Sequence, residues 1–134
     1  MKIHHVGYLV KDINKAIDAF EKLGIEKYGD VFFDEDRKSH ICFMGNQHEV
    51  ELIAPSKESD IYPLLKKYCN MPYHICYEVQ NLDESIAEIT SKGFLLFKDK
   101  MRACAISDEA QVAFVIHAKI GIIELVQEKV EGVS

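Results

Sequence analysis

The sequence of 134 residues contains no tryptophan, no Cys-x-x-Cys pair and no long apolar run. A membrane-spanning helix needs about 20 consecutive apolar residues, so we expect no membrane partner. The N-terminal segment MKIHHVGYLV lacks the succession of charged, apolar and small residues that marks a signal peptide, and we expect none. With 16 basic and 22 acidic residues, the formal net charge is −6. Because nucleic-acid binding requires a basic surface, we expect no nucleic-acid partner.

The cysteines are scattered along the chain, at Cys42, Cys69, Cys76 and Cys104. Cysteines without the spacing of a disulfide framework or a metal site are typical of proteins in a reducing compartment. We therefore expect free thiols, mostly as small buried apolar side chains, and a cytoplasmic location.

Two stretches of the chain resemble one another. The first reads HHVGYLVKDINKAIDAFEKLGI, and the second reads YHICYEVQNLDESIAEITSKGF. A shift of 69 positions (74 − 5) aligns them without a gap. Internal similarity of this kind indicates a fold made of two like modules. The shift superposes His5 on His74, Tyr8 on Tyr77, Val10 on Val79, Ile17 on Ile86 and Gly24 on Gly93.

Each copy has the pattern of a strand followed by a helix. Along residues 5–10 the side chains alternate, which predicts a strand with Val6, Tyr8 and Val10 facing the core and His5 facing the other way. Apolar residues at helical spacing follow, and each helix has an N-cap candidate before it and a glycine after it. These residues are Asp12 and Gly24 in the first copy, and Asn81 and Gly93 in the second.

Strands are expected to complete each half. We expect them near 26–33, 38–44 and 48–54, followed by a short helix near 60–68, and again near 94–99, 111–117 and 121–127. The segment KDKMRACAISDEA is expected to be a loop. The predicted fold class is therefore α+β, with two βαβββ modules in tandem, pseudo-twofold symmetry and curved mixed sheets. No linker rich in proline, glycine or serine separates the halves, so we expect one domain over 1–134, with modules at about 1–56 and 72–128.

The last strands of the two halves also correspond, because EVELIAP resembles IGIIELVQ. Glu51 then corresponds to Glu124, at an offset of 73 (124 − 51). In each of these strands the leucine that follows belongs to the core, so the glutamate points away from the helix. If the modules pack with pseudo-twofold symmetry, these glutamates converge with His5 and His74 on one concave face.

Two imidazoles and two carboxylates on one face predict a divalent metal site made by His5, Glu51, His74 and Glu124. Imidazole suits zinc, nickel and cobalt, and carboxylates admit harder ions such as manganese. The expected cofactor is thus a divalent ion: Ni, Zn, Co or Mn. A carboxylate within an apolar strand is costly to bury, and a metal ion removes that cost.

Small residues follow each of the two histidines on the same face, at Gly7 and Cys76, and would leave space beside an ion. His4 falls on the opposite face, where we expect a structural or surface role. The remaining histidines have no counterpart in the other half and are not expected to bind metal; they are His40, His48 and His117.

The runs HHVGYLVKDI, VELIAP, YHICYEVQNLDESI and IGIIELVQ resemble the vicinal oxygen chelate superfamily. This superfamily includes glyoxalase I, methylmalonyl-CoA epimerase, extradiol dioxygenases and bleomycin-resistance proteins. The resemblance implies paired βαβββ modules that enclose a metal cup, with ligands at His5, Glu51, His74 and Glu124. It also implies a homodimer, in which the site forms within one chain or between two.

The resemblance implies a metal-dependent lyase or isomerase. A His/Glu/His/Glu set is the pattern of glyoxalase I, that is, of a lactoylglutathione lyase. The alternative is an acyl-CoA epimerase like methylmalonyl-CoA epimerase. Epimerases show His, then Gln or Glu, then His and Glu, so Glu51 does not decide between the two. This chain lacks the glycine-rich stretch that epimerases often have before the seventh strand and the third-strand carboxylate that at least one of them uses. In both, a metal-stabilised enediolate or enolate forms, and a carboxylate moves the proton. Glu124 is the expected base, and Glu51 is the second candidate.

Both candidate substrates, a glutathione adduct and an acyl-CoA, are small and anionic. Local cations would hold them, and the candidates are Arg37, Lys38, Lys100 and Arg102. A third possibility is a non-catalytic protein that sequesters a drug in the same cup. Such binders usually lack the ligands and line the groove with aromatic residues, whereas this chain has the full ligand set and no tryptophan. A fourth protein ligand also argues against a dioxygenase, which uses three.

Overall fold

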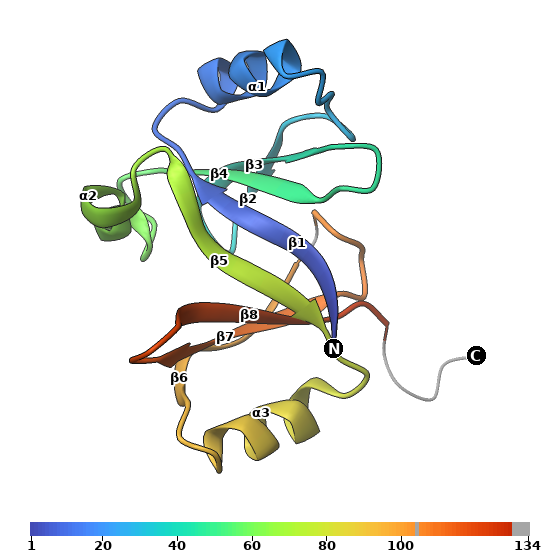
Figure 1. The fold of residues 1–134 in the computed structure, drawn as a ribbon, viewed down its shortest axis with the longest axis vertical. Helices are drawn as coiled ribbons and strands as arrows, with labels where there is room; N and C mark the ends of the chain where they lie inside the picture. The colour runs from blue at the N-terminus through green and yellow to red at the C-terminus, as the bar shows by residue number, and fades with distance from the viewer. Residues whose placement is uncertain (104, 130–134) are drawn as a thin grey trace. The chain divides into compact units, whose positions relative to one another are not determined.

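The computed structural model describes residues 1–103 and 105–129, so the prediction of a free thiol at Cys104 lies outside the described residues (Figure 1). The chain divides into two compact units. The N-terminal unit is His5–Tyr73, and the C-terminal unit is His74–Ser134 together with Met1–His4. Among the residues that the structure describes, none of the helices has both the length and the apolar character needed to span a bilayer.

The N-terminal unit contains a four-stranded sheet and one long helix. Along the chain its elements are β1 (Lys2–Leu9, which belongs to this unit from His5 on), α1 (Ile13–Lys22), β2 (Phe32–Asp34), β3 (Ser39–Met44), β4 (Val50–Pro55), η1 (Tyr62–Leu64) and α2 (Leu65–Tyr68). The strand order is β2-β3-β4-β1, in which β1 and β4 run parallel and the other neighbours antiparallel.

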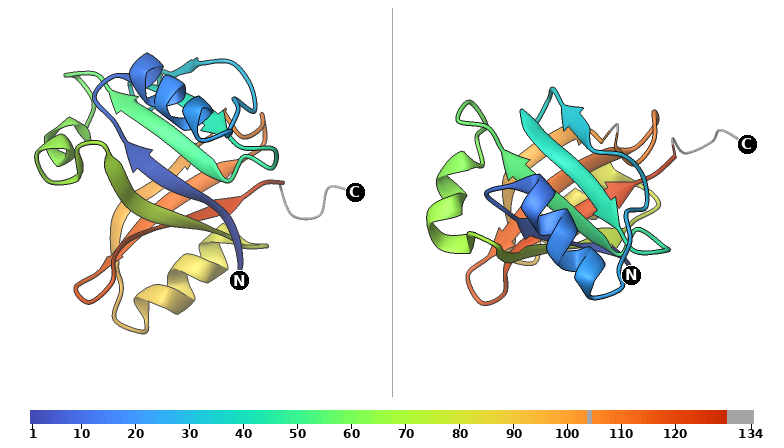
Figure 2. Two further views of the ribbon diagram at one scale, coloured as in Figure 1. Left: turned by 45° about the horizontal axis from the view of Figure 1, so that its top comes forward. Right: turned by 90° about the horizontal axis from the view of Figure 1, so that it is seen from above.

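The C-terminal unit repeats this arrangement. Its elements are β5 (Met71–Glu78, which belongs to this unit from His74 on), α3 (Leu82–Thr90), β6 (Leu95–Arg102), β7 (Gln111–His117) and β8 (Gly121–Gln127). The order is β5-β8-β7-β6, and β5 and β8 are the parallel pair. Figure 2 shows α3 packed along its own sheet, as α1 is along the first. The predicted α+β fold of two βαβββ modules with mixed sheets is confirmed.

The helix ends are as the sequence predicts. The side chain of Asp12 accepts a hydrogen bond from the backbone N–H of Lys15, and that of Asn81 accepts one from the N–H of Glu84. Past the C-terminus of each helix, a glycine takes a left-handed conformation, at φ +86° for Gly24. A residue with a Cβ atom is strained there, so this glycine lets the chain turn back toward the sheet.

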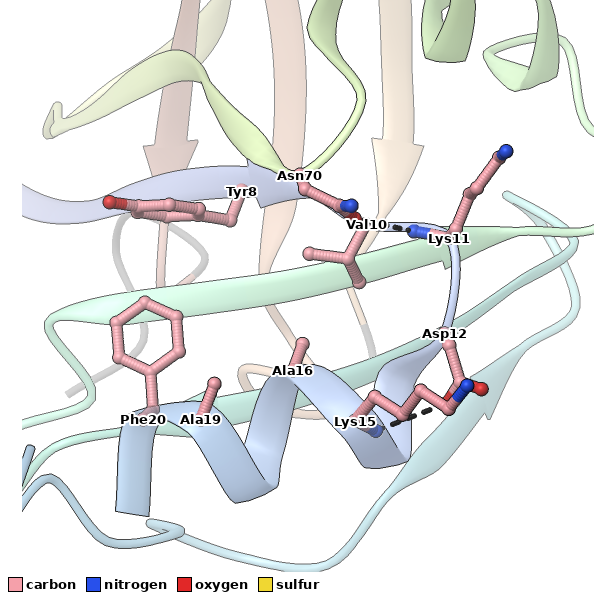
Figure 3. Close-up of a pocket in the computed structure, with 9 residues that line it drawn as sticks. All are labelled: Tyr8, Val10, Lys11, Asp12, Lys15, Ala16, Ala19, Phe20 and Asn70. Atoms are coloured by element: carbon pink, nitrogen blue, oxygen red, sulfur yellow. Dashed lines mark hydrogen bonds between the residues drawn. The ribbon is translucent and has the colours of Figure 1, made fainter. Parts of the chain in front are cut away.

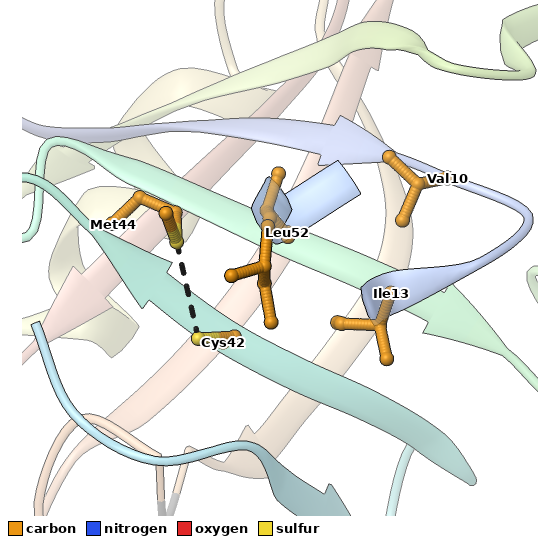
Figure 4. Close-up of a cluster of buried hydrophobic side chains, with 6 residues drawn as sticks. Val10, Ile13, Cys42, Met44 and Leu52 are labelled. Atoms are coloured by element: carbon orange, nitrogen blue, oxygen red, sulfur yellow. Dashed lines mark hydrogen bonds between the residues drawn. The ribbon is translucent and has the colours of Figure 1, made fainter. Parts of the chain in front are cut away.

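Each unit has its own apolar core between helix and sheet. In the N-terminal unit the buried cluster contains Val10, Ile13, Ile17, Cys42, Met44 and Leu52 (Figure 4). In the C-terminal unit it contains Leu82, Ala113 and Leu125. The leucines after Glu51 and Glu124 thus belong to these cores, as predicted, so the two glutamates lie on the opposite face of each sheet.

The described cysteines match the prediction of free thiols. Cys42 and Cys76 are buried, Cys69 is partly exposed, and all three are unbridged. Burial in the core raises the pKa of the Cys42 thiol. Because the thiolate is the reactive form of cysteine, Cys42 acts as a packing residue.

Three sequence predictions are wrong in detail. In place of a strand over 26–33 the structure has one bridge, from Lys27 to Met44, and then β2, because Tyr28 and Gly29 form a bend. The helix predicted near 60–68 is split into η1 and α2, with a proline in its first turn. The segment predicted as a loop is a strand as far as Arg102, because two register shifts let β6 continue past Lys98 without strict alternation.

Candidate metal centre

His5 and Glu51 form a buried pair in the N-terminal unit. Strands β1 and β4 run parallel with Gly7 opposite Glu51, which places His5 one alternation away on the same face. The Nε2 atom of His5 lies 3.1 Å from Oε1 of Glu51. The exposed fractions of the two residues are 1% and 0%.

His74 and Glu124 form the equivalent pair in the C-terminal unit. Strands β5 and β8 run parallel with Cys76 opposite Glu124. The Nε2 atom of His74 lies 2.8 Å from Oε1 of Glu124, and both residues are buried. Each half therefore brings together a histidine from its first strand and a glutamate from its last strand. These are the residues that have counterparts in the other copy of the repeat.

A phenylalanine accompanies each pair, and the sequence analysis missed it. The ring of Phe43 packs edge-on against His5, with centroids 5.4 Å apart, and Phe114 packs against His74 at 5.3 Å. Each phenylalanine is also the register partner of the glutamate of its pair. The signal was present in SHICFM and QVAFVIH, where a phenylalanine occupies the third strand of each half. These rings cover the imidazoles, and both histidines are buried.

Arg37 completes the N-terminal pair. Its Nη2 atom lies 3.4 Å from Oε2 of Glu51, and its Nε atom lies 3.1 Å from Oδ2 of Asp34. The other oxygen of Asp34 accepts hydrogen bonds from the backbone N–H groups of Asp36 and Arg37. Asp34 and Arg37 are both buried. The sequence analysis considered Arg37 as a cation for the substrate, whereas the structure places it against a candidate ligand.

The other three candidate cations lie on the surface. The ammonium of Lys100 pairs with Asp83 at 2.8 Å, and this hydrogen bond raises the pKa of Lys100. Lys38 and Arg102 are exposed. A role for these three in substrate binding stays a prediction.

The donors of each pair suit a divalent ion. Imidazole nitrogen and carboxylate oxygen are both ligand types that zinc and other divalent ions would take. The carboxylates of Glu51 and Glu124 are fully buried, and a buried carboxylate requires a compensating positive charge. That the two pairs share one ion stays a prediction.

A different cluster of titratable groups occurs in the C-terminal unit. His4, Glu78 and Glu128 have ligand-type atoms within 4.8 Å of one another. The buried imidazole of His4 lies 3.1 Å from the carboxylate of Glu128, in keeping with the structural role expected for it. A hydrogen bond with Glu128, together with burial, raises the pKa of Glu78, and the ammonium of Lys2 at 3.9 Å partly opposes this.

The other three histidines pack against aromatic rings. His40 contacts Phe33, His48 contacts Tyr28, and His117 contacts Phe94. A pocket of about 500 Å³ lies between β1 and α1, with Tyr8, Val10 and Phe20 among its lining residues (Figure 3). Because Tyr8 is on the helix-facing side of β1, this pocket is on the opposite side of the strand from His5.

Comparison by sequence gives a family match. The sequence model described as the glyoxalase/bleomycin resistance protein/dioxygenase superfamily matches residues 4–114. No curated protein sequence matches the chain significantly.

Comparison by structure gives several similar folds. A methylmalonyl-CoA epimerase variant from Streptomyces coelicolor, in complex with 2-nitronate-propionyl-CoA, matches with a TM-score of 0.76 at 20% identity, over 94% of this chain and 96% of that one. The methylmalonyl-CoA epimerase from Mycobacterium tuberculosis matches with a TM-score of 0.76 at 24% identity, over 93% of this chain and 86% of that one. A hypothetical protein from Bacillus halodurans matches with a TM-score of 0.80 at 24% identity, over 99% of this chain and 98% of that one. At these identities the likeness is one of fold.

Proposed function

The chain belongs to the glyoxalase/bleomycin resistance protein/dioxygenase superfamily, and we propose that it is a metal-dependent lyase or isomerase of the glyoxalase I type. One divalent ion would be held jointly by His5, Glu51, His74 and Glu124, within a single domain or between the two chains of a homodimer. The observation that carries the proposal is the repetition of a buried His–Glu pair in both halves of the chain.

The donor set defines the chemistry. When bound, a divalent ion supplies a Lewis acid that stabilises negative charge on the oxygens of a substrate carbonyl and its neighbour. Glu124 takes the proton from the carbon beside the carbonyl and returns it. The imidazoles of His5 and His74 would hold the ion, and Phe43 and Phe114 hold their rings in place.

A second candidate is the epimerisation of an acyl-CoA. It is favoured by the methylmalonyl-CoA epimerases among the similar structures, one of which contains a propionyl-CoA analogue. In a glyoxalase the proton returns one carbon away, whereas in an epimerase it returns to the same carbon from the other face. Both substrates are small anions, for which Lys38, Lys100 and Arg102 remain the proposed cations.

The free thiols of Cys42, Cys69 and Cys76 favour a cytoplasmic location.

Proton exchange in deuterated water tests the proposal. The metal-free protein is loaded with Ni²⁺, Co²⁺, Zn²⁺ or Mn²⁺ in turn and mixed with the glutathione–methylglyoxal adduct or with an acyl-CoA thioester. We expect deuterium in the product of the adduct and a loss of turnover of at least 100-fold in Glu124→Gln. Exposed Glu109→Gln is the matched control. Exchange only in the thioester selects the epimerase, and exchange in neither rejects both enzymes.

A further inference from the structure

A cluster of metal-ligating groups in the C-terminal unit shares no residue with the two His–Glu pairs. Its donors are the imidazole of His4 and the carboxylates of Glu78 and Glu128, and their ligand-type atoms lie within 4.8 Å of one another. His4 belongs to the N-terminal segment assigned to this unit, Glu78 ends β5, and Glu128 follows β8. We call these three residues the His4 cluster. Three separate segments of the chain therefore meet there.

His4 is the fixed donor of the cluster. Its side chain is 2% exposed, and its Nε2 atom lies 3.1 Å from Oε1 of Glu128. Burial limits rotation of the imidazole, so this nitrogen stays directed at the carboxylate. The side chains of Glu78 and Glu128 are 30% and 42% exposed. An ion in solution therefore has access to all three donors from the side of the two glutamates.

The backbone around Glu128 is held by contacts that do not use its carboxylate. The hydroxyl of Ser107 donates a hydrogen bond to the carbonyl of Glu128 at 3.3 Å. The side-chain amide of Gln127 donates to the carbonyl of Lys129 at 2.8 Å, and its oxygen accepts from the backbone N–H of Leu82 at 2.8 Å. The carboxylate of Glu128 is therefore presented to His4 from an anchored segment.

The two carboxylates of the cluster lie close enough to repel each other. A hydrogen bond joins the side chains of Glu78 and Glu128. When both are ionised they have no proton to donate, and two negative charges face each other. The ammonium of Lys2 lies 3.9 Å from Glu78, but its side chain is 82% exposed, and ion pairs of this kind contribute little. A divalent cation among the three donors would neutralise both carboxylates at once.

We propose that His4, Glu78 and Glu128 form a second metal site, which binds one Zn²⁺ ion independently of the proposed function. Zinc takes imidazole nitrogen and carboxylate oxygen as ligands, and a set of three protein ligands leaves a fourth position for water. Mg²⁺ and Ca²⁺ fit less well, because both require oxygen ligands. Since the three ligands come from separate segments, the ion binds only the folded unit and stabilises it.

This ion is expected to bind more weakly than one held jointly by the two His–Glu pairs. The His4 cluster has one ligand fewer, and water competes for its two partly exposed carboxylates. In His74→Ala the proposed four-ligand site loses a donor while the His4 cluster is complete. A small rise in Tm that remains in this variant at high Zn²⁺ concentration therefore comes from the His4 cluster.

Counting bound Zn²⁺ tests the second site without any substrate. Equilibrium dialysis of the chelator-treated full chain gives the ions bound per chain and the affinity of each step. We expect two steps in the wild type, and a weaker step that loses at least about 10-fold in affinity in Glu128→Gln, because even a hydrogen-bonded partner of a ligand contributes that much. Glu78→Gln/Glu128→Gln should lose this step entirely. Exposed Glu58→Gln/Glu109→Gln is the matched control and should keep both steps.

The two sites are separated by comparing this double variant with His74→Ala, which should keep the weaker step and lose the tighter one. If Glu78→Gln/Glu128→Gln does not fold, Glu128→Gln alone decides. Weaker binding that survives the loss of the glutamates overturns the second site, and so does a single step that only His74→Ala removes; both leave the proposed function standing. A single step that only the glutamate variants remove supports the second site and overturns the proposed metal centre. A protein that binds no Zn²⁺ overturns both.

Anomalous diffraction at the zinc edge locates the ion directly. In crystals of Glu124→Gln soaked with Zn²⁺, we expect a peak beside Nε2 of His4, between the carboxylates of Glu78 and Glu128. A weaker-bound ion that lies elsewhere on the surface overturns the assignment to the His4 cluster.

Discussion

Phe43 lies opposite Glu51 in the β3–β4 register while its ring packs edge-on against His5. One aromatic side chain therefore contacts both strands that supply the N-terminal ligands. Phe114 has the same relationship to Glu124 and His74. An imidazole held edge-on to a buried ring has few rotamers available, and its Nε2 atom stays directed at the carboxylate.

Replacement of either phenylalanine is expected to weaken both the fold and the site. Phe43→Ala and Phe114→Ala should each lower the free energy of unfolding by about 3 kcal/mol, because both rings are buried. Urea denaturation measures this change. Phe33→Ala, at a ring that is 36% exposed, is the control and should cost clearly less. A similar cost at Phe33 would show that the loss is not specific to the covered imidazoles.

Much of the fold could be predicted from local signals. Alternation along 5–10 and the caps at Asp12 and Asn81 predict a strand and a helix, because both depend on residues close in sequence. That His5 and Glu51 share one face followed from alternation, since each points away from the core-facing residues of its own strand. The limits of β6 did not follow, because a bulge shifts the alternation that identifies a strand.

Arg37 illustrates what could not be predicted about the candidate site. Its sequence neighbours, DEDRKS, are typical of an exposed turn, and a turn arginine normally extends into water. Its direction depends on Asp34, whose carboxylate binds both the backbone and the guanidinium of Arg37. The inward orientation of Arg37 is stabilised by its contact with Glu51. Because Glu51 is distant in sequence, no local pattern predicts this contact.

The N-caps give matched predictions in the two units. Asp12→Ala and Asn81→Ala each remove a side-chain acceptor from the first turn of a helix. Each should lower the free energy of unfolding by about 1 kcal/mol, as measured by urea denaturation. Asp12→Asn and Asn81→Asp keep the acceptor and should cost much less. Equal losses in the alanine variants and in these conservative variants would contradict a capping role.

Metal binding should be visible in thermal stability. An ion that binds only the folded state adds about 2.7 kcal/mol at 100 times its dissociation constant. Adding Ni²⁺, Co²⁺ or Zn²⁺ to chelator-treated protein should therefore raise Tm, and His74→Ala should greatly reduce the rise. His117→Ala is the control, because His117 belongs to neither pair. A Tm that no metal changes would favour the non-catalytic drug-binding alternative.

Glu78 and Glu128 predict a dependence of stability on pH. The raised pKa of Glu78, caused first by its hydrogen bond with Glu128 and then by burial, means that folding favours its protonated form. This contribution is complete below the pKa of a glutamate in the unfolded chain, about 4.3, and is lost as the pH rises through the higher folded pKa. The charges of His4 and Lys2 oppose the rise in pKa, so the stability that is lost with rising pH is smaller than the hydrogen bond and burial alone would give.

Glu78→Gln keeps a hydrogen-bonding group without the charge. Its Tm relative to wild type should therefore be higher at pH 8 than at pH 4.5, whereas exposed Glu58→Gln should show no such change between the two pH values. A relative Tm for Glu78→Gln that falls on going to pH 8 would mean that ionised Glu78 is stabilised by Lys2 and His4 more than it is repelled by Glu128.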